Sequence, residues 1–262
     1  MKSRIDAGVD ALFFGPHPDD VELFCGGTVA RLVARGHTVA LVDLTRGERA
    51  SRGTVDVRAR ESDEAARILG VAARENLALK DGGLRAHAEG DDEDPASPVL
   101  RIADVLRRAR PRVVVLPYPR ERHADHEAAS ALVTRALTLA RLAKVTTTSG
   151  ASAHEVRTVL LYPQRVLAEP SFVTDVSDVY ERKLAAIRAH ASQVSEDAQN
   201  GTLVGSPGAL DALVARDTFY GAQIGVARAE PFVSRARLSV DDPLAFFDEG
   251  ARGRAFFFPD IA

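Results

Sequence analysis

Residues 9–20 read VDALFFGPHPDD, a short apolar run that ends in glycine and is followed at once by a histidine and two aspartates. The apolar run predicts a buried strand. Residues 27–35 then carry apolar side chains at helical spacing up to Gly36, and residues 38–45 (TVALVDLT) predict a second strand. A strand, a helix and a second strand in this order are typical of a parallel sheet.

The same alternation continues along the chain. Helices are predicted over 55–69, 99–109, 178–191, 207–221 and in the region between Pro117 and Lys144, and strands over 76–79, 112–116, 156–162 and 172–176, before an irregular tail. This order predicts an α/β fold with a Rossmann-like, mostly parallel sheet and helices on both faces. We expect a single domain over 1–262, with a core over residues 8–145 and a C-terminal completion over 155–262.

The composition excludes several classes of protein. A hydrophobic fraction of 45% and a charged fraction of 27% are typical of a globular chain. The net charge of −3, with acids interspersed among the arginines, gives no basis for nucleic-acid binding. Cys25 is the only cysteine, so a disulfide within the chain and a multi-cysteine zinc site are excluded. No segment has the apolar length of a membrane span or a signal peptide, and we expect a cytoplasmic protein.

Two polar clusters each follow a predicted buried strand. They are His17-Pro18-Asp19-Asp20 and His123-Ala124-Asp125-His126. If the strands lie in the order 3-2-1-4, the two clusters face one crevice at the carboxyl ends of neighbouring strands. Two histidines and an aspartate with one open position suit a catalytic zinc ion. The structural alternatives are a turn whose Asp20 caps the next helix, and two solvated histidines three residues apart.

The glycines that follow the first cluster do not indicate a nucleotide site. Gly26-Gly27-Thr28 lacks both the G-x-G-x-x-G pattern and the phosphate loop. We expect these glycines to let a helix pack close to the sheet and the metal loop. Cys25 beside them is expected to be a small buried side chain.

The clusters carry a family resemblance. Residues 15–22 (GPHPDDVE) with 26–28 (GGT), and residues 123–126 (HADH), resemble the two signatures of LmbE-like (PIG-L-type) zinc N-deacetylases, which act on N-acetylglucosamine derivatives. Residues 43–48, between the two signatures, also fit this family. Segments 170–172 and 183–193, among others, are more closely similar to the bacillithiol-pathway branch, the N-acetylglucosaminyl-malate deacetylases. The resemblance implies the LmbE-like deacetylase fold over nearly the whole chain.

The resemblance also implies roles for individual residues. One Zn²⁺ per subunit would be bound by His17, Asp20 and His126, although iron or manganese would accept the same donors. Asp19 would be the general base, and His123 would stabilise the oxyanion and protonate the leaving amine. Asp125 would orient or tune His123. Arg58 and Arg122 would bind the malate carboxylates, and Glu48 would lie in the substrate loop.

The implied activity is hydrolysis of N-acetylglucosaminyl-malate to glucosaminyl-malate and acetate. Arg228 replaces a tyrosine that is usual in this branch, so another N-acetylglucosamine conjugate is the first alternative: an inositol glycoside, an antibiotic precursor or a chitin fragment. A non-catalytic sugar-binding protein is the second alternative. The expected partner is this small molecule, with no nucleic acid or membrane, and the resemblance implies a homo-oligomer, a trimer or a hexamer.

Overall fold

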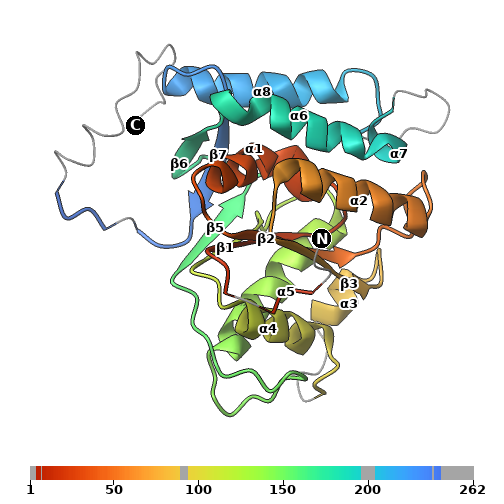
Figure 1. Cartoon of the computed structure of the whole chain (residues 1–262), viewed down its shortest axis with the longest axis vertical. Helices are drawn as coiled ribbons and strands as arrows, with labels where there is room; N and C mark the ends of the chain where they lie inside the picture. The colour runs from red at the N-terminus through yellow and green to blue at the C-terminus, as the bar shows by residue number, and fades with distance from the viewer. Residues whose placement is uncertain (1–3, 7, 89–93, 196–203, 238, 243–262) are drawn as a thin grey trace.

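A seven-stranded sheet lies between two layers of helices in the computed structural model, which describes residues 4–6, 8–88, 94–195, 204–237 and 239–242 (Figure 1). The strand order is β3-β2-β1-β4-β5-β7-β6. The parallel strands are β1 (Ala11–Gly15), β2 (Val39–Thr45), β3 (Ala73–Leu79), β4 (Val113–Pro117) and β5 (Thr158–Tyr162). Strand β7 (Ala229–Ser234) runs antiparallel to both β5 and β6 (Phe172–Asp175). The predicted, mostly parallel α/β fold is confirmed.

Helices cover both faces of the sheet. One face carries α1 (Asp20–Ala34), α2 (Val55–Leu69), α6 (Tyr180–Ala189) and α8 (Ala209–Gln223), with the short η1 (Ser177–Val179) and α7 (Ala191–Val194) (Figure 1). The other carries α3 (Leu84–Ala88), α4 (Pro98–Ala109) and α5 (Ala124–Ala140). Strand β1 alternates between the two cores: Leu12 and Phe14 pack with α4 and α5, whereas Ala11 and Phe13 pack with α1 and α2.

Capping residues explain the helices whose boundaries were predicted well. The hydroxyl of Thr54 accepts a hydrogen bond from the Val57 N–H (3.2 Å), and Gly70 ends α2 in the left-handed conformation. Ser97 caps α4 in the same way, with Pro98 at its first position. Both signals are local and can be read from sequence.

Three predictions differ from the structure. The first helix begins at Asp20 rather than near residue 27, the third strand begins at Ala73 rather than at 76, and the tail expected to be irregular contributes β7. The first turns of α1 are buried on every side, so residues 20–26 show no alternation of apolar and polar positions. Strand β7 (AEPFVS) contains glutamate and proline and lacks the pattern of a buried strand.

Helix α1 consists of two segments that join at Cys25, whose φ of −146° and ψ of 17° are not helical. Both carboxylate oxygens of Glu230 cap the second segment, accepting hydrogen bonds from the backbone N–H groups of Gly27 (2.9 Å) and Thr28 (2.6 Å). A side chain at Gly27 would place Cβ 2.8 Å from Cβ of Val176, which leaves no room for one. Strand β7 therefore fixes the helix that begins at the second aspartate of the first cluster.

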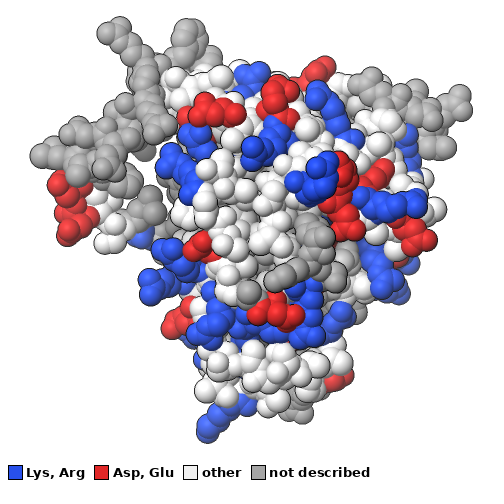
Figure 2. Space-filling model, in the orientation of Figure 1, with Lys and Arg blue, Asp and Glu red and all other residues white. Residues whose placement is uncertain are grey.

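The surface face drawn in Figure 2 carries basic and acidic side chains interspersed with one another. Within the described part of the chain, no helix combines the length and apolar character required to cross a bilayer.

Candidate metal centre and active site

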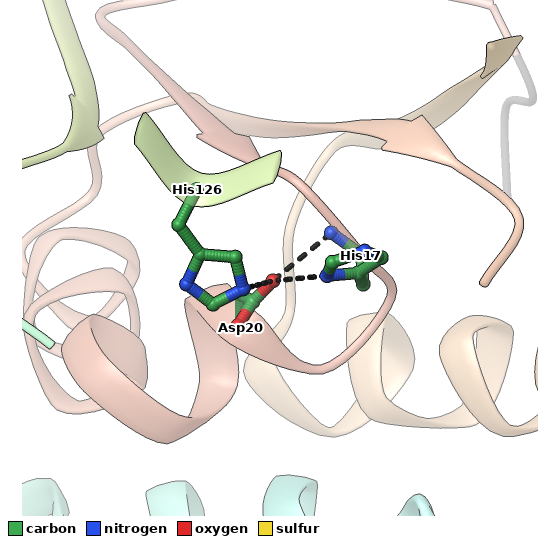
Figure 3. Close-up of side chains that lie close together, drawn as sticks. All are labelled: His17, Asp20 and His126. Atoms are coloured by element: carbon green, nitrogen blue, oxygen red, sulfur yellow. Dashed lines mark hydrogen bonds and ion pairs between the residues drawn. The ribbon is translucent and has the colours of Figure 1, made fainter. Parts of the chain in front are cut away.

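The two polar clusters meet at one edge of the sheet. Strands β1 and β4 are parallel neighbours, so the loops after them emerge side by side. His17 follows β1, Asp20 opens α1 and His126 lies in the first turn of α5. One nitrogen of each imidazole and one carboxylate oxygen lie within 4.8 Å of one another and point to a common centre (Figure 3).

The spacing of these donors fits a metal ion. The carboxylate Oδ2 of Asp20 is 3.3 Å from Nδ1 of His17 and 3.5 Å from Nε2 of His126. In a tetrahedral zinc site with bonds of about 2.0–2.1 Å, neighbouring donors lie roughly 3.4 Å apart. Two imidazoles and a carboxylate also suit iron and manganese. The donor set is therefore suited to one divalent cation, and it leaves the identity of that cation open.

The second nitrogen of each imidazole faces an acceptor. Nε2 of His17 lies 3.1 Å from Oδ1 of Asp81, and Nδ1 of His126 lies 2.6 Å from Oε1 of Gln164. The Gln164 amide also donates to Oδ1 of Asp20 (3.4 Å). Such contacts fix the tautomer, because the nitrogen bound to the acceptor carries the proton and the other keeps its lone pair for a metal.

The carboxylates of this centre stay ionised at neutral pH. Burial acts to raise the pKa of Asp20, but the charges of His126 and His17 outweigh it and hold that pKa below its usual range. Burial likewise opposes ionisation of Asp81, but hydrogen bonds from His17 and the Arg49 N–H lower its pKa to about 2. Burial also opposes protonation of His17, yet contacts with Asp125, Asp20 and Asp81 raise its pKa. The negative charge of these carboxylates favours positive charge at the centre, whether a proton on His17 or a cation.

Asp19 occupies an unusual position beside these donors. Its φ of 131° and ψ of −27° are rarely adopted by residues other than glycine. Burial and the charge of Asp20 raise the pKa of its carboxyl group to about 6. Nη2 of Arg58 lies 3.5 Å from Oδ2 of Asp19 and donates to the Pro18 carbonyl (2.8 Å), while Nη1 donates to the Gly47 carbonyl (3.0 Å). Arg58 therefore holds the loop that carries Asp19.

His123 caps α5 at the open side of the centre. Its Nδ1 accepts a hydrogen bond from the Asp125 N–H (3.2 Å), so the proton of the neutral ring lies on Nε2. The carboxylate of Asp125 accepts hydrogen bonds from the backbone of Gly82 (2.6 Å) and Leu84 (3.2 Å) and lies 3.6 Å from Nε2 of His17. Asp125 thus contacts His123 through its backbone N–H, while its carboxylate contacts Gly82, Leu84 and His17.

The three residues expected to bind substrate lie in different surroundings. Arg58 is buried and lines the cavity of about 330 Å³ that contains the metal donors. Arg122 is exposed and lines the adjoining cavity. Glu48 accepts a hydrogen bond from the Asp81 N–H (2.8 Å) and so positions the Asp81 turn.

The other two side chains singled out in the sequence lie away from the donors. Arg228 lies over the ring of Tyr180, with Cζ 5.2 Å from its centroid. Cys25 is fully buried, and burial raises the pKa of its thiol. Neither residue lines the cavity over the donors.

Sequence reasoning missed Asp81, Gln164 and Arg165. Asp81 comes two residues after the end of β3, and Gln164 and Arg165 follow β5 just as closely. The rule that placed the two clusters, polar residues just beyond the carboxyl ends of parallel strands, applies to each of them. Applied to single residues as well as to clusters, it would have identified all three.

Comparison with known proteins places the chain in a family. A family model described as "PIG-L: GlcNAc-PI de-N-acetylase" matches residues 12–137, which include all three candidate metal donors. The diacetylchitobiose deacetylase of Thermococcus kodakarensis is 34% identical over 190 residues, covering 70% of this chain and 69% of that protein. The chain belongs to the PIG-L family. The family part of the resemblance seen in the sequence is thus confirmed.

Other PIG-L relatives have different substrates in their names. The 1D-myo-inositol 2-acetamido-2-deoxy-alpha-D-glucopyranoside deacetylase of Mycobacteroides abscessus is 31% identical, covering 83% of this chain and 91% of that protein. The probable N-acetyl-alpha-D-glucosaminyl L-malate deacetylase 2 of Bacillus cereus is 29% identical, covering 68% and 80%. A particular closeness to the malate branch is not confirmed.

Solved structures share the PIG-L fold with this chain. The conserved protein TT1542 from Thermus thermophilus superposes with a TM-score of 0.78 at 39% identity, covering 89% of this chain and 98% of that one. The N,N'-diacetylchitobiose deacetylase from Pyrococcus horikoshii gives 0.71 at 26% identity, covering 86% and 83%.

Proposed function

We propose that this chain is a zinc-dependent deacetylase that hydrolyses the N-acetyl group of an N-acetylglucosamine conjugate. The first candidate substrate is N-acetylglucosaminyl-malate, which would give glucosaminyl-malate and acetate. The observation that carries the proposal is the set of three donors at metal-binding spacing, with Asp19 and His123 beside it. Membership of a deacetylase family supports the reaction class. The inositol and chitobiose conjugates in the names of relatives are the alternative substrates.

His17, Asp20 and His126 would hold the zinc ion. When bound, zinc would supply Lewis acidity, which polarises the acetyl carbonyl and makes water easier to deprotonate near neutral pH. Asp19 would take the proton from the attacking water. A pKa near 6 suits a general base at neutral pH, because the group is mostly ionised yet still basic.

His123 would act on the other side of the scissile amide. Its exposed ring presents the Nε2–H, because the Asp125 N–H occupies Nδ1. A hydrogen bond from this N–H to the developing oxyanion stabilises the transition state, a large contribution in acyl-transfer enzymes. Protonation of the leaving amine by His123 requires a doubly protonated ring, so Nδ1 must first release the Asp125 N–H and take a proton from solvent, to which the ring is exposed.

The test is acetate release by the zinc-loaded protein from four compounds: N-acetylglucosaminyl-malate, the inositol glycoside, N,N'-diacetylchitobiose and free N-acetylglucosamine. We expect acetate from at least one conjugate and none after the metal is removed by a chelator. A preference for the malate compound establishes the first candidate. If the protein prefers another conjugate, it is a deacetylase with that conjugate, and not the malate compound, as its substrate. If the metal-bound protein releases acetate from none of them, the result favours the alternative of a non-catalytic sugar-binding protein.

A further inference from the structure

A second cavity of about 500 Å³ adjoins the metal centre. It lies between the start of α1, the loop after β5 and the start of α8. Arg165 and Val204 line both this cavity and the one over the metal donors. Gln164, which contacts His126 and Asp20, also lines it. A substrate whose acetamido group reaches the metal donors therefore extends directly into the second cavity.

The walls of this second cavity are mainly apolar. Leu23, Phe24 and Leu213 form buried parts of the wall, and Ala212 faces the cavity from α8. Leu167 lies at the rim with 77% of its surface exposed, which is unusual for a large aliphatic side chain. Walls of this kind suit an apolar group, because burying such a group against them removes apolar surface of both from water.

The charged side chains on the same walls are all basic. Among the described residues that line the cavity, Arg122, Arg165 and Arg216 are the charged ones, and none is acidic. Arg216 is neutralised, because its Nη2 lies 2.7 Å from Oδ1 of Asp217. The guanidinium groups of Arg122 and Arg165 have no ion-pair partner among the described residues. Arg165 rests on Phe24, with Cζ 5.6 Å from the ring centroid.

We propose that this cavity binds the aglycone of the substrate, and that its preferred aglycone joins an apolar body, aryl or alkyl, to an anionic group. The apolar body packs against Phe24, Ala212 and Leu213, and the anion pairs with Arg165. The inference rests on the proposed deacetylase function and narrows its substrate class. Of the candidate aglycones, malate supplies the anion but little apolar body, and the inositol and chitobiose aglycones supply neither. It also places a specificity residue, Arg165, just after β5.

The experiment compares kcat/KM for glycosides of N-acetylglucosamine that differ only in the aglycone: methyl, phenyl, 4-carbamoylphenyl and 4-carboxyphenyl. The phenyl-to-methyl ratio of kcat/KM measures the contribution of the apolar walls. The carboxyphenyl-to-carbamoylphenyl ratio measures the contribution of the negative charge at nearly constant size. We expect kcat/KM to be roughly tenfold higher for the phenyl than for the methyl glycoside, because the ring buries apolar surface. We expect a further factor of roughly ten for 4-carboxyphenyl over 4-carbamoylphenyl, as for one partly exposed charge-assisted contact. Equal values for all four glycosides would overturn the inference while leaving the deacetylase intact.

Two variants assign the preference to the walls. Arg165→Gln should reduce the carboxyl-to-carbamoyl ratio to about one, since glutamine carries no charge. Ala212→Phe, at an exposed helix position, should fill the cavity and reduce the phenyl-to-methyl ratio. Arg188→Gln, on the exposed surface of α6, is the matched control and should leave both ratios unchanged. If both kcat/KM ratios stay unchanged in Arg165→Gln and in Ala212→Phe, the aglycone does not bind in this cavity.

A binding measurement separates this inference from the proposed function. The deacetylated product, 4-carboxyphenyl glucosaminide, needs no turnover to bind, and its affinity can be measured by calorimetry beside that of methyl glucosaminide. We expect the carboxyphenyl compound to bind roughly tenfold more tightly, and Arg165→Gln to remove the difference. If no glycoside releases acetate but this difference is present, only the reaction is wrong. Equal affinities would overturn the aglycone cavity.

Discussion

Asp19 and Asp20 are adjacent in the chain yet face different surroundings. Asp20 points to the imidazoles of His17 and His126, whereas Asp19 points to Arg58. The positive φ of Asp19 makes this divergence possible at a cost of about 1–3 kcal/mol. The strain is tolerated because Arg58 binds the carbonyl of Pro18, directly before Asp19, and ties it to the carbonyl of Gly47 in the loop after β2.

Asp19→Asn should remove the general base and keep the shape of the loop. We expect acetate release to fall by about 10²–10⁴, the usual contribution of a positioned base, with the metal content unchanged. Elemental analysis of the purified variant and steady-state rates measure the two quantities. Asp63→Asn, on the exposed face of α2, is the control. An Asp19→Asn variant as active as the wild type would remove the proposed base.

The backbone strain can be measured separately from the chemistry. Asp19→Gly and Asp19→Ala both delete the carboxylate, but only glycine adopts a φ of 131° without strain. We expect the glycine variant to have the higher free energy of unfolding by about 1 kcal/mol, measured by urea denaturation of the two proteins. Equal stabilities would show that the backbone of Asp19 relaxes in the alanine variant.

Buried charges on three C-terminal elements support α1. The Nζ of Lys183 on α6 lies 2.6 Å from Asp217 on α8 and 2.7 Å from Glu230 on β7. Glu230 in turn caps the second segment of α1 at Gly27 and Thr28. These side chains are fully buried, so each charge depends on its partners.

Glu230→Gln should weaken this support strongly. The amide cannot neutralise Lys183, and its NH₂ group cannot accept the N–H that one carboxylate oxygen now accepts. We expect the free energy of unfolding to fall by about 3–5 kcal/mol, the usual cost of breaking a buried ion pair. Glu64→Gln, in the exposed pair with Arg67, should change it by less than about 1 kcal/mol. Equal effects in urea denaturation would contradict the role given to Glu230.

The bounds of some helices and strands could be predicted from the sequence, and those of others could not. Helix α2 has both ends marked by local residues, Thr54 and Gly70, and its predicted bounds match the structure. The start of α1 and strand β7 depend on contacts between distant segments, and no local pattern in the sequence records such contacts. The two polar clusters were visible because each gathers histidine and aspartate side chains within four residues, whereas Asp81 and Gln164 lie outside any such cluster.

Over the whole molecule, the sheet assembles the site from several strand ends. Residues just beyond β1, β3, β4 and β5 all contribute to it, because parallel strands bring their carboxyl ends to one edge. The elements after β5 complete the second cavity and supply the buried charges under α1. Stability of the site therefore depends on parts of the chain beyond the two clusters.

This dependence predicts how the molecule responds to acid. Burial acts to raise the pKa of Asp217, but Lys183 and Arg216 outweigh it and hold that pKa below its usual range. The folded state then binds fewer protons here than the unfolded chain, whose carboxyl titrates at about 3.9. The stabilisation by Asp217 should be complete above that pH and be lost as the pH falls through it towards the lower folded value.

The measurement is the urea midpoint of the wild type and Asp217→Asn as a function of pH. We expect the wild type to be more stable near neutral pH, and the difference to shrink as the pH falls below about 4. Asp63→Asn, on the exposed surface, should show no such convergence. A stability difference that is the same at all pH values would mean that Asp217 acts by shape rather than by charge.

The cap that Glu230 places on Gly27 joins residues 203 positions apart. During synthesis on the ribosome, α1 and the loop with both aspartates emerge long before the carboxylate that completes them. A nascent chain whose β7 has not yet been synthesised thus contains His17 and Asp20 but lacks the Glu230 cap on α1. Under the proposed function, the metal should therefore reach its final geometry among the last events in the maturation of this protein.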